Sequence, residues 1–99
     1  MEVKISYRQL EAQPQIEERI GSKALKLKKF FNGKMHVDWT CIKEGDLHQS
    51  DVVVRGDHFE VFASSQNSNL FKSIDDVTEK LEKQIQKKNE LLKDKIHRK

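Results

Sequence analysis

Residues 34–64, KMHVDWTCIKEGDLHQSDVVVRGDHFEVFAS, decide the fold of this 99-residue chain. Polar and apolar side chains alternate in residues 34–44, and the short segments at residues 50–55 and 59–64 are expected to form the next two strands. A period of two residues is typical of strands that bury one face. Turn signals separate the segments, with a loop expected over residues 45–49 and a turn at residues 56–57. The stretch therefore predicts three strands in an antiparallel meander.

The flanking sequence adds one more strand and two helices. Polar and apolar side chains alternate in residues 2–7, EVKISY, as they do in residues 34–44. A helix is expected over residues 14–31, because Pro14 suits a first helical turn and apolar side chains follow at helical spacing. These are Ile16, Ile20, Ala24, Leu27 and Phe31. A second helix follows the cap-forming residues 67–69. Its apolar stripe comprises Leu70, Ile74, Val77, Leu81 and Ile85.

The resulting order, β-α-β-β-β-α, predicts one α+β domain over residues 1–99. Its four-stranded, mainly antiparallel sheet would carry both helices on one face. The last helix is expected to project past the sheet and to fray over about residues 90–99.

Composition excludes several classes of protein. No apolar run approaches the ~18 residues of a membrane span, and the N-terminus lacks the apolar segment of a signal peptide. The single cysteine excludes an internal disulfide and fits a reducing, cytoplasmic compartment. No membrane partner is therefore expected.

Catalytic and metal-binding patterns are missing from the sequence. Cys41 shares a strand face with Val37 and Trp39, which indicates a core thiol and not a nucleophile. The histidines and Cys41 show no ligand spacing such as CxxC or HxxxH. The chain has no GxGxxG, P-loop or GxSxG motif. We therefore expect no catalytic residue, no metal, no cofactor and no enzyme activity.

The net charge of +3 hides an uneven distribution. Residues 16–31 hold five basic and two acidic side chains, and residues 80–99 hold eight basic and three acidic ones, whereas residues 32–79 are acidic overall. At ~100° per residue, the basic side chains fall into two rows, each within about 60° of arc beside an apolar stripe. The first basic ridge is Arg19, Lys23 and Lys26, and the second basic ridge is Lys80, Lys83 and Lys87, with Lys88 nearby.

Helices packed side by side would bring the two ridges to a shared groove. Two facing rows of lysine suit a phosphate backbone, and binding there would weaken as salt rises. Lysine supplies point charge, so the groove would read RNA shape more than RNA sequence. The competing interpretation is that the lysine stems cover the edges of each stripe while their ammonium groups reach water.

Short motifs along the chain carry a resemblance to a known family. They are KALKL with FF at residues 23–31, HQSD at 48–51, FEV and AS at 59–64, LFKSID at 70–75, and KLEKQIQKK at 80–88. In this order the chain resembles the short ribosome hibernation-promoting factors, also called ribosome-associated inhibitors or sigma-54 modulation proteins. Phe71 departs from the family's frequent tyrosine, Asn89 from a common basic residue, and residues 57–58 from a more glycine-rich turn.

The resemblance implies a topology like that of double-stranded-RNA-binding domains and a site in the tRNA and mRNA channel of the small ribosomal subunit. By the family pattern, the ribosomal-RNA contacts are Lys23, Lys26, Lys80, Lys83, Lys87 and, more weakly, Lys88. It also implies translational silencing under stress or in stationary phase, a monomer off the ribosome and no DNA partner. The length is that of the short type, which promotes ribosome dimers only with a separate small ribosome-modulation factor.

Two other functions stay open at this point. The first is a general module for structured RNA that acts off the ribosome and shares the same electrostatics. The second is a protein-interaction module that uses the final helix, with Leu91, Leu92 and Ile96 as its contacts.

Overall fold

The fold is taken from a computed structural model that describes the backbone of residues 1–31 and 33–97, and the side chains of this part as far as Lys88. Its elements are β1 (Glu2–Arg8), α1 (Pro14–Lys28), β2 (His36–Glu44), β3 (Leu47–Arg55), β4 (Glu60–Asn67) and α2 (Leu70–His97). This order confirms the predicted β-α-β-β-β-α arrangement.

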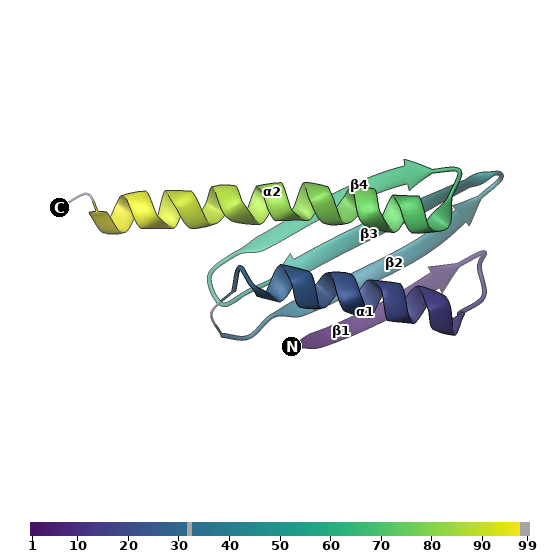
Figure 1. The fold of residues 1–99 in the computed structure, drawn as a ribbon, viewed down its shortest axis with the longest axis horizontal. Coiled ribbons are helices and arrows are strands. Elements are labelled where there is room, and N and C mark those ends of the chain that lie inside the picture. The colour runs from purple at the N-terminus through teal and green to yellow at the C-terminus, as the bar shows by residue number, and fades with distance from the viewer. Residues whose placement is uncertain (32, 98–99) are drawn as a thin grey trace.

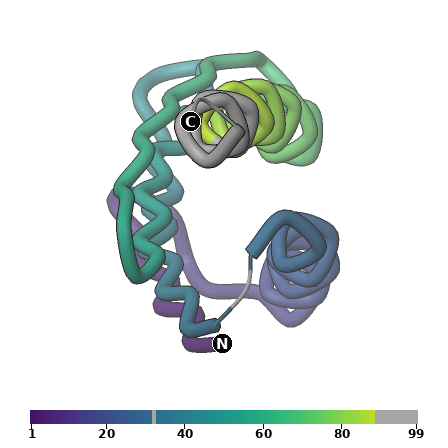
Figure 2. Tube along the Cα trace, turned by 90° about the vertical axis from the view of Figure 1, so that its left-hand side faces the viewer, coloured from purple at the N-terminus to yellow at the C-terminus, as the bar shows by residue number. Residues whose placement is uncertain are grey.

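The strands form one sheet in the order β1-β2-β3-β4. β1 runs parallel to β2, and the β2–β3 and β3–β4 pairs are antiparallel, so the sheet is mixed and mainly antiparallel as predicted. Figure 1 shows α1 and α2 lying across the sheet, and Figure 2 shows both helices side by side on the same face. No helix in the described part of the chain covers the opposite face of the sheet.

The core lies between the sheet and the two helices. Each helix buries its predicted stripe: Ile16, Ile20, Ala24 and Leu27 from α1, and Ile74, Val77, Leu81 and Ile85 from α2. The sheet contributes the inward side of the alternating pattern, with Val37, Trp39 and Cys41 from β2 and Val52 and Val54 from β3. Burial of this apolar surface is the main force that holds both helices on the sheet.

Two boundaries differ from the sequence prediction. The expected loop at residues 45–49 is a tight hairpin, because Glu44 pairs directly with Leu47 and Gly45 adopts a positive φ of 61°. Glycine at the first position of a two-residue turn matches the twist of paired strands. β3 therefore begins at Leu47, and β4 in turn continues through Asn67 to pair with it.

The first helix ends earlier than its apolar spacing predicts. α1 stops at Lys28, and Phe31 leaves the helical path to stack on Phe59, with ring centroids 4.9 Å apart. Gly56 lies against the Phe31 ring, where an added Cβ would meet ring carbons at 3.0 Å. The aromatic pair thus closes the end of the core beside the β3–β4 turn. A longer α1 would move Phe31 away from Phe59.

α2 has 28 residues, and Figure 1 shows its C-terminal part running past the sheet. Among the described helices, none is long and apolar enough to cross a membrane. The expected contact residues Leu91, Leu92 and Ile96 lie outside the described side chains, and residues 98–99 lie outside the described backbone.

Candidate nucleic-acid interface

The first basic ridge projects from the flank of α1 that faces α2. Arg19 Nη1 lies 3.3 Å from Asp75 Oδ1, and Lys23 Nζ lies 3.2 Å from the same oxygen. Farther along the helices, Lys26 Nζ lies 3.2 Å from Glu82 Oε1. Two acidic residues of α2 therefore neutralise much of this ridge.

The second basic ridge lies on the other flank of α2, beside β4. Lys80 Nζ donates a hydrogen bond of 2.8 Å to the carbonyl oxygen of Ser64, and Gln84 Nε2 donates one of 2.9 Å to the carbonyl oxygen of Phe62. Lys83 is exposed and helps to line a shallow pocket of about 300 Å³ on this flank, together with Lys80 and the carboxylates of Asp76 and Glu79.

The expectation of one shared basic groove is wrong for this structure. The apolar stripe of α2 has two flanks: Asp75 and Glu82 occupy the one that faces α1, and the second basic ridge occupies the one that faces β4. The spacing of residues on a single helix places a ridge beside the buried stripe. It does not say which flank meets the neighbouring helix, and here the acidic flank does.

Lys83 and Lys87 are the freest cations of the candidate site. Both are exposed, and neither forms an ion pair with any residue in the described part of the chain. Lys88 is partly buried and lies on the same side of α2 as Leu81 and Ile85, from which it is seven and three residues away. The second ridge therefore offers a polyanion cations that no described ion pair engages, with Asp76 and Glu79 nearby in the same pocket.

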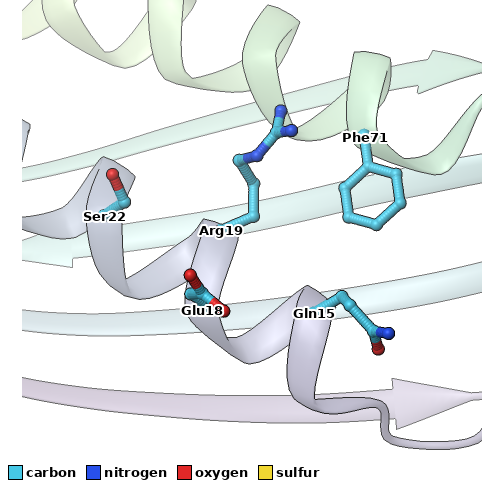
Figure 3. A pocket seen from close by; sticks show the side chains of 5 residues that line it. All are labelled: Gln15, Glu18, Arg19, Ser22 and Phe71. Atoms are coloured by element: carbon cyan, nitrogen blue, oxygen red, sulfur yellow. The ribbon is translucent and has the colours of Figure 1, made fainter.

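A shallow pocket of about 400 Å³ lies between the N-terminal parts of the helices and is lined by Gln15, Glu18, Arg19, Ser22 and Phe71 (Figure 3). The guanidinium carbon of Arg19 lies 5.1 Å from the centroid of the Phe71 ring, within range of a cation–π contact. The pocket therefore holds Arg19 by an aromatic face as well as by Asp75. The ring face is the part of Phe71 that makes this contact, and the contact needs no hydroxyl group.

Sequence reasoning missed the acidic partners of the first ridge. Asp75 and Glu82 are seven residues apart, which is two helical turns, and this spacing puts them on one flank of the α2 stripe. The available signal was that Asp75 and Glu82 lie on one flank and the lysines of the second ridge on the other, where Asp76 and Glu79 also lie. It points to a helix whose two flanks face different neighbours.

The titratable groups of the core do not form a reactive centre. Burial raises the pKa of the Cys41 thiol to about 11, so the group is a neutral thiol near pH 7 and a weak nucleophile. Desolvation, followed by the nearby Glu17 carboxylate, raises the pKa of Tyr7 to about 12. No group of three or more His, Cys, Asp or Glu residues within the described part of the chain is arranged to hold a metal ion.

The mixed sheet and its two helices define an α+β domain of β-α-β-β-β-α topology with basic rows on its helix layer. The chain belongs to the family described as Sigma 54 modulation protein / S30EA ribosomal protein, whose model matches residues 3–93. This is a family of ribosome-associated modulation and hibernation factors and is not known as an enzyme family. No curated protein matched the chain.

Solved structures of low sequence identity share the fold. The N-terminal domain of Protein Y from Thermus thermophilus superposes with a TM-score of 0.83 at 20% identity, covering 88% of this chain and 98% of that one. A ribosomal subunit interface protein from Coxiella burnetii superposes with a TM-score of 0.78 at 16% identity, covering 90% and 98%. At these identities the comparison establishes the architecture alone.

Proposed function

We propose that this chain binds ribosomal RNA of the small subunit in the channel for tRNA and mRNA, and so silences translation. The second basic ridge makes the first and strongest phosphate contacts. Lys23 and Lys26 of the first ridge add contacts once their ion pairs with Asp75 and Glu82 break, and the partly buried Lys88 adds a weaker one. As a ribosome-bound factor, the protein acts in the cytoplasm.

The observation that carries the proposal is the exposure of Lys83 and Lys87 in a chain of this family. Each free lysine that meets a phosphate releases a condensed counterion, which favours binding at low salt. Arrest under stress or in stationary phase, a monomer off the ribosome and the pairing of ribosomes with a separate small factor follow from the resemblance, and belong to the same proposal.

Co-sedimentation with small ribosomal subunits over a salt series, with cell-free translation as the second readout, tests the proposal. The triple change Lys80→Glu, Lys83→Glu and Lys87→Glu should abolish both binding and inhibition. Lys4→Glu, Lys34→Glu and Lys43→Glu form the matched control, since they change the charge equally at exposed sites elsewhere. Because Lys80 also bonds to β4, the double change at Lys83 and Lys87 alone is included, and folding is checked by circular dichroism.

Binding and inhibition that survive the triple change would overturn the assignment of the site. Competition separates the ribosomal function from the general RNA-binding one. Generic duplex RNA and RNA of the small subunit are compared as competitors. If both displace the protein from the subunit equally well, the protein is not specific for the channel. Truncation after Lys88 tests the protein-interaction alternative, which predicts loss of function while RNA binding persists.

A further inference from the structure

The ion pairs between the helices combine a reachable group with a partly buried one. In the Lys26–Glu82 pair the lysine side chain is 54% exposed and the glutamate 19%. In the Lys23–Asp75 pair the lysine is 24% exposed and the aspartate 45%. A phosphate that approaches from solvent therefore meets the ammonium group of Lys26 in the first pair, but the carboxylate of Asp75 in the second.

Asp75 forms ion pairs with two cations of the first basic ridge. Arg19 and Lys23 both contact its Oδ1 atom, at 3.3 Å and 3.2 Å. Phe71 holds the Arg19 guanidinium from a second direction at 5.1 Å. The first basic ridge is thus fixed in position by groups on α2 before any ligand arrives.

The two carboxylates also weaken the electrostatic attraction between the first basic ridge and a polyanion. Both carboxylates beside the first ridge are in ion pairs with its cations. Asp76 and Glu79 line a pocket with Lys80 and Lys83 of the second ridge, but no cation of that ridge forms an ion pair with a described residue. A phosphate that takes Lys26 must leave Glu82 without its partner and close to the new anion. A ligand therefore binds Lys26 favourably only if its other contacts with the protein compensate for the broken ion pair.

We propose that Asp75 and Glu82 determine specificity by standing in for RNA phosphates on the first basic ridge. Their ion pairs fix the positions of Arg19, Lys23 and Lys26 and weaken the binding of RNA that lacks a matching shape. An RNA whose folded shape brings phosphates to both ridges together displaces them. Discrimination is a difference between two affinities, and an element that penalises the wrong partner contributes to it as much as a contact to the right one. The inference rests on the proposed function, because it assigns the preferred ligand to the small subunit.

The test compares two double variants that change the net charge equally. Asp75→Asn with Glu82→Gln removes both stand-ins, and Asp46→Asn with Glu44→Gln removes two exposed carboxylates at the β2–β3 turn. The probes are a generic RNA duplex of about 16 base pairs, the span of a double-stranded-RNA-binding domain, and purified small ribosomal subunits. Affinity is measured for both over a salt series.

We expect Asp75→Asn with Glu82→Gln to bind the duplex about tenfold more tightly than the control variant at low salt. Its plot of log affinity against log salt should steepen by up to about 0.9 for each cation freed. Affinity for the small subunit should rise less, so the ratio of the two affinities falls. If the double variant does not fold, the single changes Asp75→Asn and Glu82→Gln are compared with Asp46→Asn and Glu44→Gln.

Equal duplex affinities and equal salt slopes for the two variants would overturn the inference. That outcome is distinct from failure of the proposed function, which is read from the wild-type chain and the lysine variants on the small subunit. If the double variant binds the duplex more tightly but no form of the protein binds the small subunit, the subunit is not the ligand. The proposed basis of specificity then fails as well.

Discussion

The ammonium nitrogen of Lys80 lies 2.8 Å from the carbonyl oxygen of Ser64, and this hydrogen bond ties α2 to the free edge of β4. Gln84 makes the corresponding bond to Phe62 one turn later. β4 is an edge strand, and an uncovered edge exposes unpaired backbone groups to other chains. Lys80 therefore serves the fold as well as the charge of the second basic ridge.

Replacing Lys80 should cost stability, whereas replacing its neighbour on the ridge should not. Lys80→Ala removes the bond to Ser64 and should lower the free energy of unfolding by about 0.5–1 kcal/mol. Lys83→Ala, on the same surface but without such a bond, should stay within about 0.5 kcal/mol of wild type. Urea denaturation followed by circular dichroism measures both. Equal losses would show that the Lys80 bond has no net effect in solution.

Much of the fold could be predicted because the hydrophobic periods are strong. The alternation around Trp39 and the stripe through Leu81 each imply one buried face, and both residues are fully buried or nearly so. Phe31 shows where such reasoning fails. It continues the helical spacing, but stacking on Phe59 is a tertiary contact, and it overrides the local pattern.

The candidate site could be predicted only in part, for a related reason. The positions of Lys23 and Lys83 beside apolar stripes follow from helical spacing alone. Their pairing with Asp75 or their freedom from it depends on which flank of α2 meets α1. The packing of both helices on the sheet determines which flank of α2 faces α1. The hydrophobic period of a single segment contains no information about it.

A buried hydroxyl pair fixes the start of α2 on β3 and provides a directional test. Ser73 Oγ donates to the carbonyl oxygen of Leu70 at 2.6 Å, so its single proton is used. Ser50 Oγ, 3.1 Å away, must then donate to Ser73 Oγ. Both side chains are fully buried, so neither hydroxyl has water as an alternative partner.

Ser73→Ala should therefore destabilise the protein more than Ser50→Ala. The first change leaves the buried Ser50 hydroxyl without its acceptor, at a cost of about 1–3 kcal/mol, whereas the second leaves Ser73 bonded to Leu70. In the double variant the penalty for the orphaned hydroxyl disappears, so the two effects should not add. A double-mutant cycle by urea denaturation measures the difference. Equal single losses that simply add would contradict this direction of bonding.

Stability should fall in alkali because of Cys41. Burial raises the pKa of this thiol from 9.0 to about 11, so the unfolded chain loses the proton at lower pH than the folded one. The stabilising effect is complete below pH 9 and is lost as pH rises from about 9 to about 11, by at most about 1.4 kcal/mol per pH unit.

Urea midpoints at intervals between pH 8 and pH 11 test the alkaline loss of stability. Cys41→Ala is the control, because it removes the thiol and leaves Tyr7, whose pKa is raised from 10.0 to about 12 and which causes its own loss of stability above about pH 10. The wild-type curve should fall more steeply than that of the control in this range. Parallel curves would mean that the thiol is not the group responsible.

Free and paired lysines should differ in how they contribute to ribosome binding. Lys83→Gln removes a cation that has no ion-pair partner among the described residues, and should reduce the slope of log affinity against log salt by about 1. Lys26→Gln should reduce it less, because Glu82 already neutralises Lys26 and phosphate binding there releases less counterion. Lys43→Gln, an exposed change on β2, controls for net charge. If the slope fell equally for Lys26 and Lys83, the ion pair with Glu82 would have no effect on RNA binding, and the charge of each lysine would count regardless of its partner.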